Sequence, residues 1–186
     1  MTGLGSRLAV LVLVGVLAAA CTDNADPKPL PSPSASPSAS PSSSAPVAPT
    51  LPAEAKGKSA ASAKAFVRYW VAVLNYSGPA GDTRDLRSLS AQRCIDCDAI
   101  ADFIEQVSGA GGAITGKGWT VRNVRIIDGA GTNGPTLDAL VDVSPQRVIP
   151  KAGAKPRRFP GGKRLKTFWL QWQHATWSVS RLDQSQ

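Results

Sequence analysis

The chain has 186 residues and a formal net charge of +8, with three cysteines and a single histidine. So few Cys and His side chains argue against a zinc site, which needs about four ligands, and we expect no cofactor. The positive charge favours an anionic partner, but the export signal described next argues against nucleic acid.

Residues 1–20 have the pattern of an export signal. Arg7 precedes an uncharged apolar run of thirteen residues from Leu8 to Ala20. A membrane-spanning helix needs about 20 apolar residues, whereas a signal peptide needs a basic start, about 7–15 apolar residues and small residues at the cleavage site. We therefore expect residues 1–20 to be a signal peptide and the protein to leave the cytoplasm.

The segment "LAAAC" at residues 17–21 resembles the lipobox of bacterial lipoproteins, although Ala18 stands where that motif usually has leucine. The resemblance implies that the thiol of Cys21 carries a diacylglyceryl group and anchors the protein to the extracytoplasmic face of the cell membrane. Two or three acyl chains anchor a protein stably, whereas one holds it weakly. Alternatively, "AAA" at 18–20 fits ordinary signal cleavage, which would leave a freely secreted protein beginning at Cys21.

Residues 21–55 have the composition of a disordered linker. Nine of the fifteen prolines lie in the 26 residues from Pro27 to Pro52, together with a repeated "SPSA". Such a segment buries too little apolar area to offset the entropy of ordering it, and its prolines favour extended polyproline II at ~3.1 Å per residue. We expect a spacer that carries a domain away from the bilayer.

The first half of the remaining domain, residues 56–186, predicts helices. A helix over 59–78, with Ser59 or Ser62 as its cap and Gly78 after its end, has an apolar stripe. A short helical turn capped by Asp82 or Thr83 follows, and a third helix starts at Cys97 and stops at the glycines of "SGAGG". The apolar stripes consist of Phe66, Trp70, Val73 and Leu74 in the first helix and Cys97, Ile100, Ile104 and Val107 in the third.

The second half predicts strands. Residues 119–128 are rich in β-branched side chains, but their alternation slips as at a bulge. Residues 136–144 alternate, with Leu137, Ala139, Val141 and Val143 on one face and Thr136, Asp138, Leu140 and Asp142 on the other, toward solvent. Residues 166–183 predict two strands joined near His174 and Ala175. Helices followed by strands indicate an α+β domain with one core.

The ending "FWLQWQHATWSVSRLD" resembles the last hairpin of the cone-shaped nuclear transport factor 2-like fold. The resemblance implies N-terminal helices packed on a curved antiparallel sheet. Together with the lipobox and the linker, "AFVRYWVAVLNYSGPAGDTRDLRSLSAQRCIDC" and "SGAGG" resemble an actinobacterial lipoprotein family of unknown function. Membership in that family implies no particular activity.

The motif "CIDC" places Cys94 and Cys97 three residues apart. In an exported protein such a pair most simply forms a local disulfide, which would clip the short helical turn to the third helix. Thiol exchange chemistry is the alternative, since a cysteine near a helix N-terminus has a lowered pKa, but no strand precedes the pair as in thioredoxins. A zinc site at this pair would need about two further ligands, and the only other Cys or His in residues 56–186 is the distant His174.

No set of side chains predicts catalysis. His174 falls in the predicted turn between the last strands, where an exposed polar residue is ordinary. The other candidates for a cavity in this fold are Tyr69, Asp102, Asp138 and Asp142. Tyr69 shares a helix face with core residues, and the predicted faces of the strand give no pair of acid and base. We expect no enzyme activity.

A strongly basic segment follows the predicted strand 136–144. Prolines and glycines predict a mobile loop with Phe159 near its tip. Such a loop could bind anionic lipid headgroups or cell-wall polymers, at about 1 kcal/mol per cation near a charged membrane. Alternatively, the loop is a solvated insertion that keeps the domain soluble. Its eight cations, with no acid among them, are Arg147, Lys151, Lys155, Arg157, Arg158, Lys163, Arg164 and Lys166.

The sequence therefore predicts a membrane-anchored extracytoplasmic lipoprotein whose non-catalytic domain binds an envelope partner. The rival hypothesis is a small-ligand carrier or an enzyme that uses a cavity between the helices and the sheet.

Overall fold

The computed structural model describes residues 47–127 and 134–185, all within the second of two units of the chain, residues 43–186. The predicted signal peptide, Cys21 and most of the Pro/Ser-rich segment lie outside the described residues. Packed structure begins before Lys56, because a short 3-10 helix, η1 (Ala53–Ala55), buries Ala55 in the core.

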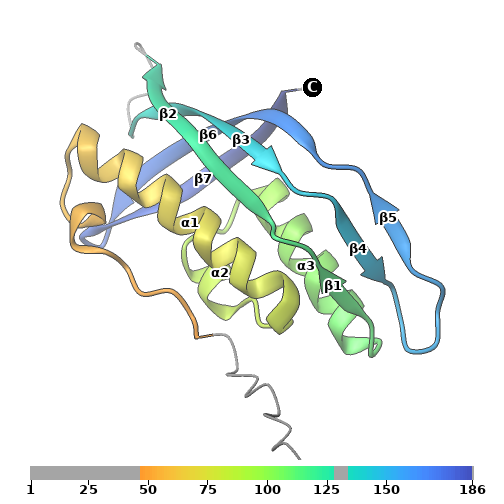
Figure 1. The fold of residues 1–186 in the computed structure, drawn as a ribbon. Coiled ribbons are helices and arrows are strands. Elements are labelled where there is room, and N and C mark those ends of the chain that lie inside the picture. The colour runs from red at the N-terminus through yellow and green to blue at the C-terminus, as the bar shows by residue number, and fades with distance from the viewer. Residues whose placement is uncertain (1–46, 128–133, 186) are drawn as a thin grey trace, which may run out of the picture. The chain divides into compact units, whose positions relative to one another are not determined.

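Three α-helices follow η1, as the sequence predicts: α1 (Ala60–Ala80), α2 (Arg84–Ser88) and α3 (Ile95–Gly109) (Figure 1). Ser59 caps α1, since its side chain accepts a hydrogen bond from the Ser62 backbone N–H while the Ser62 side chain accepts one from Ser59. The helix passes the predicted stop at Gly78 and ends at Gly81, where a φ of 68° lets the chain turn away. No helix in the described part of the chain is long and apolar enough to cross a membrane.

Four antiparallel strands form the main sheet in the order β2-β3-β6-β7. They are β2 (Trp119–Ile127), β3 (Thr136–Val143), β6 (Gly162–Gln173) and β7 (Thr176–Ser185). The register of β2 against β3 shifts between Val121 and Asn123, which confirms the predicted bulge. His174 and Ala175 form the β6–β7 turn with φ of 51° and 60°, as a two-residue type I′ hairpin requires.

A second sheet has the order β1-β4-β5 and contains β1 (Ala113–Thr115), β4 (Gln146–Ile149) and β5 (Arg157–Phe159). It continues the β3–β6 pairing past a corner, because Val143 pairs with Gly162 and Gln146 pairs with Phe159. At the corner Pro145 and Pro160 supply no N–H donor to the ladder. A side chain at Gly161 would meet the Val143 carbonyl oxygen at 2.4 Å, so the corner also requires a glycine.

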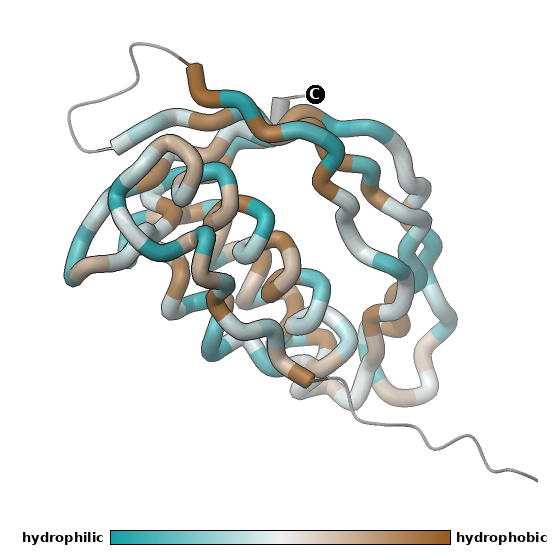
Figure 2. The backbone as a smooth tube through the Cα atoms, turned by 60° about the vertical axis from the view of Figure 1, so that its left-hand side comes forward, coloured by the Kyte–Doolittle hydropathy of each residue, from teal (hydrophilic) through white to brown (hydrophobic). Residues whose placement is uncertain are grey.

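The core lies between the helices and the inner face of the main sheet, which confirms the α+β prediction of helices packed on a curved antiparallel sheet (Figure 1). Hydrophobic and hydrophilic positions alternate along the strands in Figure 2, as expected for a sheet with one buried face. The rings of Trp70 on α1 and Phe168 on β6 pack edge to face, with centroids 5.4 Å apart. Both side chains are almost fully buried.

The prediction that Asp138 faces solvent is wrong, because the side chain is only 6% exposed. Strand alternation does place Asp138 on the outer face, but side chains from the neighbouring strands β2 and β6 pack against it. Arg125 on β2 donates to its carboxylate at 2.9 Å, and the Thr167 hydroxyl on β6 donates at 2.9 Å. A buried carboxylate is tolerated here because it is paired and hydrogen-bonded.

Candidate anion-binding site

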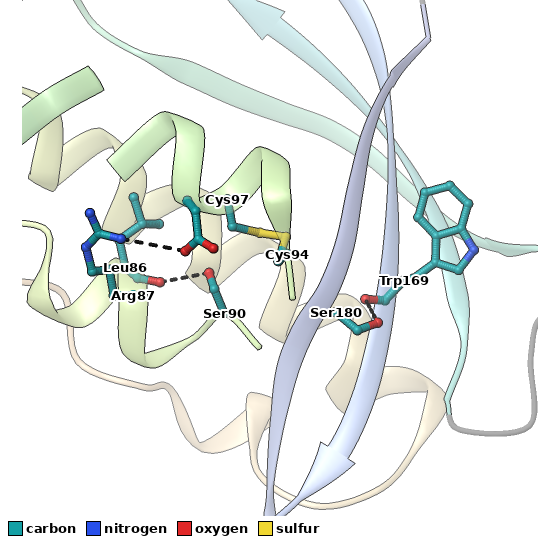
Figure 3. Close-up of a disulfide and its surroundings, with 8 residues drawn as sticks. Leu86, Arg87, Ser90, Cys94, Cys97, Trp169 and Ser180 are labelled. Carbon is teal, nitrogen blue, oxygen red and sulfur yellow. Dashed lines mark hydrogen bonds and ion pairs between the residues drawn. A yellow bond between two sulfur atoms is a disulfide. The ribbon is translucent and has the colours of Figure 1, made fainter. Parts of the chain in front are cut away.

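The cysteine pair forms a disulfide within the first turn of α3 (Figure 3). Cys94 is the N-terminal cap of the helix, so the bond closes that turn. The prediction that it clips α2 to α3 is therefore wrong. The two cysteines are 0% and 1% exposed. Their burial among core side chains favours a structural role over thiol exchange with another protein.

Asp102, one of the candidates for catalysis, belongs to an ion-pair cluster between α2 and α3. Arg87 lies 2.6 Å from the Asp102 carboxylate and 2.9 Å from that of Glu105. The Thr83 hydroxyl also donates to Glu105. Hydrogen bonds from Arg87 and then Thr83 lower the pKa of Glu105 to about 2. The cluster joins two helices and holds the carboxylates of Asp102 and Glu105 in ion pairs.

The remaining candidates lie apart and have structural contacts. Burial raises the pKa of the Tyr69 phenol, whose hydroxyl donates to the Pro49 carbonyl at 3.4 Å. Asp142 pairs with Arg122 at 2.7 Å, and His174 is exposed in the β6–β7 turn. Within residues 47–127 and 134–185, no three His, Cys, Asp or Glu side chains gather in a way that could hold a metal ion.

The basic segment is a loop only over residues 150–156, which contain Lys151 and Lys155. Its arginines instead lie on strands, Arg147 on β4 and Arg157 and Arg158 on β5. The apolar pair Val148–Ile149 explains why a strand forms in this basic segment. Val148 is buried and pairs with Ile114, so β4 packs beside β1. We call residues 146–159 the cationic hairpin; its exposed cations are Arg147, Lys151, Lys155, Arg157 and Arg158.

Lys166 does not belong to a surface site. It lies on the inner face of β6, two residues before the core residue Phe168, and is 3% exposed. Its ammonium group lies 5.1 Å from the ring centroid of Trp119, a cation–π contact, and desolvation lowers its pKa. Lys163 and Arg164 are exposed at the start of the same strand.

Two arginines of the cationic hairpin occupy directly opposed positions on neighbouring strands. Arg147 on β4 is the register partner of Arg158 on β5, and on its other side Arg147 pairs with Thr115 on β1. Like charges directly opposite on neighbouring strands are destabilising. An anion that bridges the two side chains would remove this repulsion.

No carboxylate compensates the cationic hairpin in the part of the chain that the structure describes. The salt bridges there involve Arg84, Arg87, Arg122, Arg125 and Arg181 on other elements. The sequence also contains no acidic residue between Asp142 and Asp183. The hairpin is therefore a concentration of positive charge available to a partner.

A hollow of about 490 Å³ contains the opposed arginines in its wall. Phe159, which is 45% exposed, adds an apolar edge next to Arg158. We call this space the arginine hollow. Its wall consists of Thr115, Gly116, Pro145, Gln146, Arg147, Arg158, Phe159 and Pro160.

A smaller pocket of about 190 Å³ lies where α1 and α3 meet β1 and the start of β2. We call it the apolar pocket; no titratable side chain lines it. Asn75 is occupied, because its amide accepts from the Trp119 N–H and donates to the Trp119 carbonyl, both at 2.8 Å. The lining residues are Leu74, Asn75, Gly78, Pro79, Ile100, Phe103, Ile104, Ile114, Thr115, Gly116, Gly118, Trp119 and Gln146.

Neither the apolar pocket nor the role of β1 can be predicted from the sequence. The three-residue strand "AIT" brings Ile114 and Thr115 to both hollows but is too short for a periodic signal. The only local sequence signal near β1 is the pair of glycines at 116 and 118, which favours a sharp turn. In the structure their φ values are 142° and 71°.

Several solved structures are similar to this chain in overall fold. The intermembrane space region of the chloroplast protein ARC6 has 11% identity and a TM-score of 0.45, over 69% of this chain and 97% of that chain. A cystatin-like domain of unknown function from Nostoc punctiforme has 13% identity and a TM-score of 0.39, over 64% and 74%. A nuclear transport factor 2-like protein with a cystatin-like fold from Novosphingobium aromaticivorans has 12% identity and a TM-score of 0.37, over 63% and 77%.

No curated protein matches the chain in sequence. Residues 36–183 match the sequence profile described as "Family of unknown function (DUF6318)". The match covers most of the chain and nearly all of the described structure. The chain therefore belongs to the DUF6318 family, whose function is unknown.

Proposed function

We propose that the protein is an extracytoplasmic lipoprotein, held at the membrane through Cys21, whose domain binds an anionic envelope component without catalysing a reaction. The partner's recognised chemistry is a phosphate or carboxylate group, as found in anionic lipid headgroups and in cell-wall polymers. The binding surface is the cationic hairpin with the arginine hollow. Lys163 and Arg164, at the start of β6, add charge nearby.

The opposed pair Arg147 and Arg158 is the observation that carries this proposal. A solubilising insertion would serve equally well with its charges spread apart, whereas two arginines at directly opposed strand positions repel each other, and an anion bound between them would offset that repulsion. Guanidinium groups also bind phosphate and carboxylate through two parallel hydrogen bonds.

The strength expected of this surface follows from its charge. Each cation near an anionic membrane contributes about 1 kcal/mol, so several exposed cations give useful affinity without an apolar interface. The attraction between exposed charges falls off within a Debye length, about 10 Å at 0.1 M salt. Binding should therefore weaken strongly as salt is added.

Vesicle sedimentation tests the proposal. The full chain carrying Cys21→Ala, which has no acylation site, is mixed with vesicles of phosphatidylcholine alone or with added phosphatidylglycerol. Comparison of the two vesicles removes any apolar contribution from the N-terminal segment. We expect tighter binding to the anionic vesicles that weakens with salt, and competition by a soluble phosphate polymer if the partner is a wall polymer. Equal binding to both vesicles, with no binding to the phosphate polymer, would overturn the proposal.

A second candidate function, the carriage of a small ligand, is favoured by the apolar pocket. The pocket is lined mainly by apolar side chains, which suits the binding of an apolar ligand. None of its lining side chains is titratable, so none can act as an acid or base in catalysis.

A further inference from the structure

The apolar pocket and the arginine hollow are neighbours. Thr115, Gly116 and Gln146 belong to the walls of both. These residues come from β1, the turn after it and the start of β4. The two hollows are therefore adjacent, and a molecule longer than the apolar pocket that passed this shared wall would reach the space lined by Arg147 and Arg158.

The apolar pocket suits part of a ligand. Its volume of about 190 Å³ is below the ~300 Å³ at which pockets commonly hold a whole drug-sized molecule. Aliphatic and aromatic side chains such as Leu74, Ile100 and Trp119 line it, and the Asn75 amide is already bonded to backbone. A polar group placed there would lose its hydrogen bonds to water without replacement, whereas an alkyl chain loses none.

Charge in the adjacent hollow determines what the alkyl chain is attached to. The arginine hollow offers two guanidinium groups that form no salt bridge within the described residues, and Phe103, which is 45% exposed, widens the apolar surface of the pocket. An apolar segment next to an anion is the chemistry of an anionic amphiphile, such as a fatty acid or a single-chain phospholipid.

We propose that the two hollows form one binding site for an anionic amphiphile, with the alkyl chain in the apolar pocket and the headgroup on Arg147 and Arg158. This inference rests on the proposed function, since the headgroup contacts are those of the cationic hairpin. It adds selection for a ligand with a chain, which a purely electrostatic surface would not make.

The affinity for monoalkyl phosphates tests the proposal. Isothermal titration of the full chain carrying Cys21→Ala compares inorganic phosphate with butyl, hexyl and octyl phosphate below their micelle concentrations. We expect affinity to rise about fourfold for each added methylene until the pocket is full. If affinity does not depend on chain length, the amphiphile site is refuted, while the binding of anionic vesicles would still support the hairpin proposal.

Gly78 on α1 offers a matched pair of variants. A Cβ at this position would lie 3.8 Å from the Ile114 side chain, so Gly78→Leu extends into the apolar pocket, while Gly78→Ala adds only an ordinary contact. We expect Gly78→Leu to abolish the dependence on chain length without changing vesicle binding, and Gly78→Ala to keep both. Retention of the dependence in a folded Gly78→Leu protein would contradict the site.

Two further measurements complete the test. Phe103→Ala removes exposed apolar area at the pocket and should lower octyl phosphate affinity severalfold while leaving inorganic phosphate unchanged, a result that does not depend on the folding of Gly78→Leu. An equal loss for both phosphates would count against an alkyl chain in the pocket. Transfer of lysophosphatidylglycerol out of vesicles would identify the membrane as the ligand's source, and binding of monomeric octyl phosphate without transfer would identify a soluble amphiphile.

Discussion

Trp177 on β7 donates its indole N–H to the hydroxyl of Ser62 on α1 at 3.2 Å, which joins the last strand to the first helix. Both side chains are buried. The same hydroxyl donates to the Gly57 carbonyl at 2.6 Å and accepts from the Ser59 N–H at 2.9 Å. The Ser62 hydroxyl thus takes part in the cap of α1 and also accepts the hydrogen bond of a buried tryptophan.

Ser62→Ala should lower the free energy of unfolding by about 2 kcal/mol, because it leaves the buried indole N–H of Trp177 without an acceptor. Ser59→Ala removes only the cap and should cost about 1 kcal/mol. Urea unfolding followed by tryptophan fluorescence measures both. Equal losses in the two variants would mean that the bond to Trp177 contributes nothing.

Reduction of the Cys94–Cys97 disulfide should lower the free energy of unfolding by about 2 kcal/mol, the chain-entropy value for so short a loop. Urea unfolding with and without a reductant measures the loss. The Cys94→Ala/Cys97→Ala protein is the control, and the reductant should not change its stability. An unchanged wild-type curve in reductant would show that the bond does not constrain the unfolded chain.

Lys166 should make stability depend on pH at alkaline values. Its folded pKa lies below the ordinary 10.5, mainly through desolvation, so the unfolded chain holds more protons between the two values and stability rises with pH there. Lys166→Met removes this rise and should be more stable than wild type at pH 7. Lys163→Met, on the exposed start of the same strand, is the control and should keep the wild-type slope. A Lys166→Met profile parallel to wild type from pH 7 to about 10.5 would contradict the burial of the charge.

Cys21→Ala should move the protein out of the membrane fraction or leave it unprocessed, because no acyl chain then holds it. Fractionation and detergent partitioning of cells expressing the two forms measure this. An intact mass of the native protein should show a lipidated N-terminal cysteine. An unmodified thiol there, or unchanged partitioning of the variant, would refute the lipid anchor.

Elements with local signals could be predicted from the sequence. The cap at Ser59, the helical stripe through Trp70 and the turn at His174 and Ala175 each depend on neighbouring residues, and the structure has all three. Cys94 and Cys97 are also close in the chain, so their pairing required no knowledge of the fold.

Features set by contacts between distant segments could not be predicted. Strand β5 has three residues, two of them arginines, and exists because β4 pairs with it. The charge of its segment predicts Lys166 on the surface, although its alternation with Phe168 places it inside. The arginine hollow needs β1, β4 and β5 side by side, and no single stretch of sequence contains that arrangement.

The most direct test of the central claim removes the opposed charges. Arg147→Gln/Arg158→Gln is compared with Lys56→Gln/Lys64→Gln, which loses the same charge from exposed positions outside the hairpin. Both are made in the full chain carrying Cys21→Ala and titrated with phosphatidylglycerol vesicles. Loss of two cations at about 1 kcal/mol each predicts about 30-fold weaker binding for the arginine pair and a much smaller change for the lysine pair. Equal weakening in the two proteins would mean that net charge alone drives binding and would contradict a site on the cationic hairpin.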